Sequence, residues 1–157
     1  MDAPDDWPVE GHGKGAGWLT VQDFGRGYSQ MHADEAVLNH LSERIIGCAF
    51  MVANGLGRGF LEKVYENALA LELRSHGMTA GQQHGIAVKY NGVTVGQYTA
   101  DLLVEEAILV EIKSTKAIDP AHLAQCRHYL KATGLRLCLL INFGPPRVEI
   151  KRIVLNL

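Results

Sequence analysis

Cysteine is scarce in this sequence. Its 157 residues include three, Cys48, Cys126 and Cys138, which lie far apart and form no CxxC pair. This spacing excludes both a disulfide framework and a zinc knuckle, because each needs closely or regularly spaced cysteines. We therefore expect reduced cysteines in the core or on helices.

Long apolar runs are also missing. No uninterrupted run reaches the roughly 18 apolar residues of a membrane-spanning helix, and the N-terminus lacks the basic start and apolar segment of a secretory signal. We therefore expect a cytoplasmic protein with no membrane partner. With 47% hydrophobic and 20% charged residues the composition is that of a globular protein, and this length suits one domain.

The net charge of −2 conceals an uneven distribution of charge. Residues 113–157 contain eight Lys and Arg but only two Asp and Glu, whereas the preceding part is acidic. If the basic side chains gather on one side, they could bind a polyanion such as a nucleic acid. They could equally do no more than offset the acidic remainder of the surface, and the sequence leaves both interpretations open.

Glycine is concentrated at the N-terminus, where residues 1–30 contain six and show no sustained apolar period. This composition predicts a flexible tail over residues 1–32 and a folded domain over residues 33–157. Helical spacing of apolar residues begins after Asp34, a candidate N-cap, and ends at Gly55. A second helix fits residues 60–77, with Gly77 as its C-terminal cap. Its inner side is expected to consist of Leu61, Val64, Tyr65, Ala68, Leu69, Leu71 and Leu73.

The period then changes to two, which predicts strands. Residues 85–114 give three, joined by a hairpin at Asn91-Gly92 and a second turn at Glu105-Glu106. Residues 119–133 fit a crossover helix, with Asp119 as its N-cap, Pro120 at its first helical position and Gly134 after its end. Two further strands follow. The order ααβββαββ predicts an α/β fold (α+β by some schemes), with a central mixed sheet of about five strands flanked by helices.

The segment EEAILVEIKSTKAI, residues 105–118, places charged residues directly after a buried strand. Strand periodicity puts Glu111 and Lys113 on one face, and the turn near Glu106 brings Asp101 to within roughly 5–7 Å of Glu111. Two like charges about 5 Å apart repel by about 3 kcal/mol at an effective dielectric near 20. A divalent cation such as Mg²⁺ would offset that repulsion. In isolation, however, a D…ExK match is more often the solvated end of a strand.

Three longer segments carry a resemblance to a known family. GFLEKVY (with Gly59, Glu62 and Tyr65), YTADLLVEEAILVEIKS and HLAQCRHYLKATGLRLCLLINFG together closely resemble the GxxExxY proteins, which belong to the PD-(D/E)XK nuclease superfamily. The resemblance covers about residues 38–155. It implies a restriction-endonuclease-like core, in agreement with the element order above.

The resemblance also implies roles for individual residues. Asp101 and Glu111 match the superfamily's metal-binding acids and Lys113 its catalytic lysine, with the backbone carbonyl of Ile112 as a further metal ligand. Glu62 matches an acid on the preceding helix that can complete such a site. An acid in a first helical turn is also favoured by the helix dipole alone, so this second interpretation of Glu62 stays open.

The crossover helix adds further candidates. Gln125 and Tyr129 lie four residues apart on one helical face and match the QxxxY pattern that some of these nucleases place beside the metal. Candidate phosphate contacts are Lys116, Arg127 and Lys131. The proline that precedes the superfamily's first acid is replaced by Ala100, and because that proline binds no metal its loss changes little.

These features predict a metal-dependent nuclease that uses Mg²⁺ or Mn²⁺ to hydrolyse phosphodiester bonds of a nucleic acid, with DNA favoured as substrate. Lys113 would activate the attacking water. Two alternatives stay open: a non-catalytic nucleic-acid-binding or accessory subunit of the same fold, and an interaction protein without a nucleic-acid role. A homodimer is suggested by analogy with restriction enzymes alone.

Overall fold

The computed structural model describes the backbone of residues 21–155 and the side chains of residues 34–155. Its contacts divide the chain into two units, residues 1–34 and 35–157. The elements are α1 (Val21–Leu56), α2 (Glu62–Ser75), β1 (Ala80–Tyr90), β2 (Val93–Val104), β3 (Ile108–Lys113), α3 (Pro120–Thr133), β4 (Leu137–Asn142) and β5 (Glu149–Val154). Residues 1–20, most of the predicted tail, lie outside the described residues.

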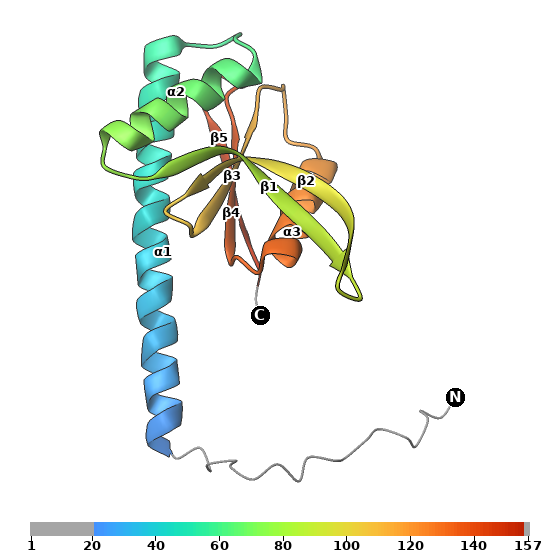
Figure 1. Cartoon of the computed structure of the whole chain (residues 1–157). Helices are drawn as coiled ribbons and strands as arrows, with labels where there is room; N and C mark the ends of the chain where they lie inside the picture. The colour runs from blue at the N-terminus through green and yellow to red at the C-terminus, as the bar shows by residue number, and fades with distance from the viewer. Residues whose placement is uncertain (1–20, 156–157) are drawn as a thin grey trace. The chain divides into compact units, whose positions relative to one another are not determined.

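The five strands form one mixed sheet in the order β1-β2-β3-β4-β5 (Figure 1). β1, β2 and β3 are antiparallel neighbours, β4 returns parallel to β3 after the crossover helix α3, and β5 is antiparallel to β4. This arrangement confirms the predicted element order, the mixed five-stranded sheet and the restriction-endonuclease-like core.

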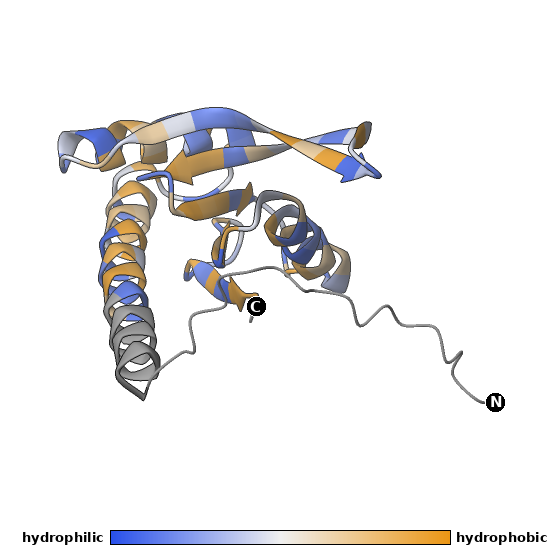
Figure 2. Cartoon of the chain, turned by 60° about the horizontal axis from the view of Figure 1, so that its bottom comes forward, coloured by the Kyte–Doolittle hydropathy of each residue, from blue (hydrophilic) through white to orange (hydrophobic). Residues whose placement is uncertain are grey.

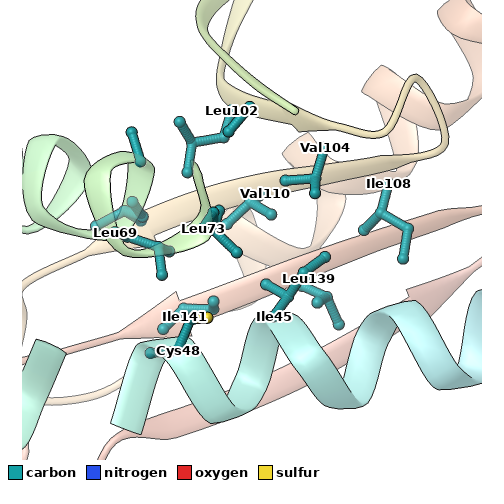
Figure 3. Close-up of a cluster of buried hydrophobic side chains, with 14 of the residues drawn as sticks. Ile45, Cys48, Leu69, Leu73, Leu102, Val104, Ile108, Val110, Leu139 and Ile141 are labelled. Carbon is teal, nitrogen blue, oxygen red and sulfur yellow. The ribbon is translucent and has the colours of Figure 1, made fainter. Parts of the chain in front are cut away.

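Helices cover both faces of this sheet and create two hydrophobic clusters. On one face, side chains of α1 and α2 such as Ile45 and Leu69 pack against Val110 of β3 (Figure 3). On the other face, Leu130 of α3 packs against Leu109. Because β3 and β4 are covered on both faces, nearly every side chain in them is buried. The two central strands therefore read as continuous apolar runs.

Helix α1 begins at Val21, thirteen residues before the predicted start at Asp34, which lies inside the helix. The segment between them contains no proline, so nothing sterically prevents the helical backbone from continuing. Its described part buries one side, including Leu41, Ala49 and Val52, and hydrophobic and hydrophilic residues alternate along it in Figure 2. By length and composition residues 34–56 could also cross a membrane, and 33% of the most apolar window in this helix is buried inside the protein.

Several local predictions are confirmed and one is wrong. Gly77 follows the end of α2 with φ of +80°, Asn91-Gly92 forms the β1–β2 turn, and the three cysteines are buried free thiols. On α2, however, Leu61 and Leu71 were expected to face inward and are 80% and 69% exposed. Sequence spacing alone permitted two overlapping apolar stripes on this helix, and the sheet covers the one that contains Tyr65.

The chain that leaves β3 is tied to the end of β4 by one buried amide. Asn142 is fully buried; its Oδ1 accepts the N–H groups of Thr115 (3.0 Å) and Gly144 (3.1 Å), and its Nδ2 donates to the Thr115 carbonyl at 2.9 Å. Gly144 packs so closely that an added Cβ would lie 2.0 Å from that carbonyl oxygen. The N–H of Phe143 also donates to the carbonyl of Lys113 at 2.8 Å. The end of β3 is therefore held in place.

We expect Asn142→Leu to lower the free energy of unfolding by about 2–4 kcal/mol, because it leaves the buried polar groups of Thr115 without partners. Urea unfolding measures the loss. The control is Asn54→Leu, since Asn54 is exposed and forms no side-chain hydrogen bond to another described residue; it should change stability by less than about 0.5 kcal/mol. Equal stability of the two variants would contradict this role of Asn142.

Candidate active site

Strands β2 and β3 separate where the two predicted acids stand. Their ladder pairs Leu102 with Val110 and ends there. One step further, the same register places Asp101 opposite Glu111, as the hairpin geometry predicted. Beyond this point β3 continues beside β4, with Glu111 paired to Leu140, whereas β2 stays beside β1. The two strands thus form a fork, and Asp101 and Glu111 lie at its base.

The two carboxylates take over the hydrogen bonds that the ladder no longer makes. The backbone N–H of Asp101 donates to Oε1 of Glu111 at 3.0 Å, and the backbone N–H of Ile112 donates to Oδ2 of Asp101 at 2.7 Å. Each acid is therefore fixed by the backbone of the opposite strand. Since each uses only one oxygen in these bonds, the second oxygen remains for another ligand.

Burial raises the pKa values of both acids, and neighbouring negative charges raise them further. The side chain of Glu111 is almost fully buried, and this burial, followed by the charge of Asp101, raises the pKa of Glu111 to about 8. Burial also raises the pKa of Asp101, although the hydrogen bond from Ile112 opposes that shift. Raised pKa values of this kind indicate that the two buried carboxylates lack sufficient positive charge nearby to offset their burial.

Lys113 supplies part of that charge. Along β3, Leu109 faces the α3 side of the sheet while Val110 and Ile112 face the other side, so alternation places Glu111 and Lys113 together on the α3 side. The ammonium group lowers the pKa of both acids. Lys113 is half-buried and forms no ion pair with any residue from 34 to 155. The structure therefore brings the three predicted groups together and leaves the lysine free.

The chemistry of these donors suits a hard divalent cation. Mg²⁺ is commonly bound by one or two carboxylates while it keeps several waters, and the fork offers two carboxylates that lack a positive partner. Over residues 34–155, no three Asp, Glu, His or Cys side chains already form a metal-binding cluster. The residues present fit a site of two acids with a backbone carbonyl, for which we predict that of Ile112, and not a closed cage of side chains.

A hollow of about 530 Å³ opens beside the fork. Asp101 lines it together with Ser114 and the first turns of α2, including Glu62. Glu62 is exposed and does not join Asp101 and Glu111 in a three-carboxylate cluster. Its charge does raise the pKa of both acids, as the last of the named causes. It is therefore placed to meet solvent or a ligand at the rim of the hollow.

Glu66, one turn further along α2, is a residue of this hollow that the sequence interpretation missed. Its side chain is 3% exposed. The negative charge of Glu66 raises the pKa of Asp101 more than the negative charge of Glu62 does. Gln82 donates to it at 2.7 Å, and Gln83 donates to its other oxygen. The spacing of four residues from Glu62 was a signal, because it puts both acids on one helical face.

Gln83 reaches Glu66 through an irregular backbone. The β1–β2 register pairs Gln82 with Leu102 and His84 with Ala100, so Gln83 lies opposite Asp101 and is unpaired without any shift of register. Its φ of +53° is rare for a residue other than glycine, asparagine or aspartate. The side chain of Gln83 also lines the hollow beside Asp101.

Two residues of the GxxExxY motif hold the start of α2 in place. The hydroxyl of Tyr65 donates to the carbonyl of Gly57 at 2.6 Å, and its ring stacks on Phe143 with centroids 4.5 Å apart. Gly59 has a φ of +97°, a backbone conformation that side chains disfavour. The motif thus joins a turn and a buried anchor to the acid Glu62.

Helix α3 contributes support more than open ligands. Tyr129 is buried, its hydroxyl donates to the carbonyl of Thr99 at 3.2 Å, and burial followed by the charges of Glu111 and Asp101 raises its pKa. It therefore lies near the acids and anchors β2 just before Asp101. Gln125 is half-buried, and its side chain forms no hydrogen bond to another described residue.

The predicted phosphate contacts are exposed but separated. Lys116 follows β3, and Lys131 lines a different hollow near the end of α3. Arg127 is exposed on the same helix. Elsewhere in the basic third of the chain, Arg152 donates to Asn39 of α1 at 2.6 Å. Among the described residues the basic side chains are thus distributed over several surfaces.

We expect Glu66→Gln to lower the pKa of Asp101, because it removes a neighbouring negative charge that raises this pKa. Carboxyl-carbon NMR titration measures the shift. Glu72→Gln is the matched control, since Glu72 is on the same helix and is not among the causes of the Asp101 shift. An unchanged pKa of Asp101 in Glu66→Gln would mean that Glu66 does not act on the fork.

Comparison with known proteins identifies the family. The model of the PD-(D/E)XK nuclease superfamily matches residues 39–153, and no curated protein matches the chain. The crystal structure of SSO0001 is similar at 20% identity with a TM-score of 0.48, covering 60% of this chain; the chain spans half the length of SSO0001. An alkaline exonuclease from Laribacter hongkongensis is similar at 17% identity with a TM-score of 0.41, covering 69% of this chain and 76% of its own.

The narrower resemblance to GxxExxY proteins stays a prediction. The superfamily match spans the sheet, α2 and α3, and with them Asp101, Glu111 and Lys113. The chain belongs to the PD-(D/E)XK nuclease superfamily.

Proposed function

We propose that this protein is a metal-dependent nuclease that hydrolyses phosphodiester bonds, with DNA as the favoured substrate. The observation that carries the proposal is the fork, where two hydrogen-bonded carboxylates and an unpaired lysine lie together in a chain of a nuclease superfamily. The open hollow beside Asp101 gives a ligand access to that carboxylate from the α2 side.

Asp101 and Glu111 would hold Mg²⁺ or Mn²⁺, with the carbonyl of Ile112 as a further ligand. A bound cation of this kind polarises a phosphoryl oxygen and lowers the pKa of a coordinated water. The opposite-strand hydrogen bonds fix both carboxylates before a substrate arrives, so little reorganisation is needed during the reaction. The role of the fork is therefore to orient the two acids.

Lys113 would act on the reacting groups themselves. Its ammonium group stabilises the negative charge that develops on the phosphate, and in its neutral form the amine could accept a proton from the attacking water. The hydrogen bonds from Phe143 to the Lys113 carbonyl and from Asn142 to the Thr115 carbonyl keep the backbone of Lys113 in position. Glu62, which is exposed, would order waters or a cation at the rim of the hollow on the α2 side.

The alternative, a nucleic-acid-binding protein of the same fold without turnover, has one observation in its favour. Glu111, with a pKa of about 8, is mostly protonated at neutral pH in the absence of a cation, and the described residues form no ready-made three-ligand cluster. Nucleic acid that is bound but never cleaved with either cation would favour this alternative.

We expect Lys113→Ala and Asp101→Asn to reduce the cleavage rate at least about a hundredfold, because each removes a group that acts on the reacting atoms. Cleavage of labelled DNA and RNA oligonucleotides in Mg²⁺ or Mn²⁺ measures the effect. Lys151→Ala, an exposed lysine on β5, is the matched control. Equal rates in all four proteins would point to a contaminating nuclease and sink the proposal.

The stabilisation by Mg²⁺ or Mn²⁺ should increase as the pH rises toward 8. Because the pKa of Glu111 is raised in the folded protein from 4.5 to about 8, its protonated form contributes stability at low pH, and this contribution is lost as the pH rises through 8. Deprotonation at the same time creates the cation ligand. Thermal melts with and without the cation at several pH values measure both effects.

Glu111→Gln is the control for this pH dependence. The amide is neutral at every pH, so we expect its cation-free melting temperature to lose that decline and its response to Mg²⁺ to be small. A variant that keeps the full, pH-dependent response would show that the cation binds elsewhere.

A further inference from the structure

A second, larger hollow lies between the β1–β2 hairpin and α3. Its volume is about 700 Å³. Lys89 comes from β1, Tyr98 from β2, and His128 and Lys131 from α3, while Ala87 and Ala132 contribute small apolar surface. Nothing in the proposed chemistry at the fork requires this hollow.

The charged side chains that line this hollow, Lys89 and Lys131, are both positive. Lys89, His128 and Lys131 are all exposed, and none forms an ion pair with a residue from 34 to 155. No acidic side chain lines the hollow among the described residues. Three unpaired nitrogen groups from two separate elements therefore surround one concave space, which favours an anionic ligand.

Tyr98 adds an aromatic surface to the same hollow. Its side chain is 46% exposed, and its ring lies 5.8 Å from that of Tyr129 at an interplanar angle of 48°. Because Tyr129 is buried and anchored to Thr99, it supports the tyrosine from below. Tyr98 thus offers a ring that is fixed on one side and open on the other, as a base-stacking platform requires.

The hollow is connected to the fork through Tyr129. The Thr99 carbonyl that accepts the Tyr129 hydroxyl belongs to the residue after Tyr98 and is two residues before Asp101. A chain of nucleotides that leaves the fork along β2 would therefore meet Tyr98 first and the lysines beyond it. Charge, an open aromatic ring and this connection come from separate observations.

We infer that this hollow is a subsite for single-stranded nucleic acid, in which Tyr98 stacks on an unpaired base and Lys89 and Lys131 contact the flanking phosphates. The inference rests on the proposed function and specifies its substrate. A duplex presents phosphates and base edges but keeps its base faces stacked, so the open ring of Tyr98 serves a base only when that base is unstacked.

The test measures binding, without turnover, in EDTA. Fluorescence anisotropy follows a labelled 12-nucleotide single strand, as DNA and as RNA, together with the corresponding blunt duplex and an abasic strand of equal length. The wild-type chain should bind at least one of the two single strands more tightly than the duplex. Tyr98→Leu should weaken this binding about tenfold, Tyr98→Phe should retain it, and the abasic strand should not distinguish wild-type from Tyr98→Leu.

Matched controls separate stacking and charge from general effects. Tyr90→Leu changes an exposed tyrosine of the same hairpin that does not line the hollow, and Lys151→Gln changes a lysine elsewhere on the sheet. Neither should affect binding. Lys89→Gln and Lys131→Gln should each reduce the slope of log affinity against log salt by about 0.7.

Two results would overturn the subsite: duplex bound more tightly than both single strands, or Tyr98→Leu no weaker than Tyr90→Leu. Because cleavage is absent in EDTA, these results are independent of the assay on Lys113 and Asp101. Loss of cleavage activity with intact Tyr98-dependent binding would reject the nuclease and retain the subsite.

Discussion

The structure depends on a pair of hydrogen bonds across the point where β2 and β3 separate. Asp101 accepts a backbone N–H from β3, and Glu111 accepts one from β2. These bonds satisfy backbone groups that the opened ladder would otherwise leave without partners, and they fix two carboxylates side by side. The cost is the burial of both acids, which raises their pKa values, with the charge of Asp101 raising that of Glu111 further. The two carboxylates of the fork are therefore fixed in position and lack a sufficient positive charge nearby. That combination suits a cation site.

The surrounding elements position this pair. Asn142 holds the segment after β3, Tyr129 holds β2 just before Asp101, and Tyr65 fixes the start of α2. In each case a buried side chain is hydrogen-bonded to a backbone group. Only one side chain therefore has to be held in a fixed conformation, whereas a contact between two side chains fixes both. The acids of α2 and the hollow lined by Tyr98 therefore lie near the fork on opposite faces of the sheet.

Local signals in the sequence were sufficient for most of the fold. Asn91-Gly92, Asp119-Pro120 and Gly134 each have a local steric or hydrogen-bonding reason, and the turn centred on Glu106 fixed the register of Asp101 against Glu111. Glu66 was missed because its role depends on which stripe of α2 the sheet covers. The positive φ of Gln83 and the early start of α1 have no such local signal, because neither proline nor a characteristic turn sequence marks them.

The most direct measurement is an anomalous-scattering crystal structure of the protein soaked in Mn²⁺. We predict an anomalous-difference peak for Mn²⁺ between the carboxylates of Asp101 and Glu111, on the side of the fork that Lys113 faces. A structure that shows Mn²⁺ bound only elsewhere, or both acids still free at a pH above 8, would contradict it.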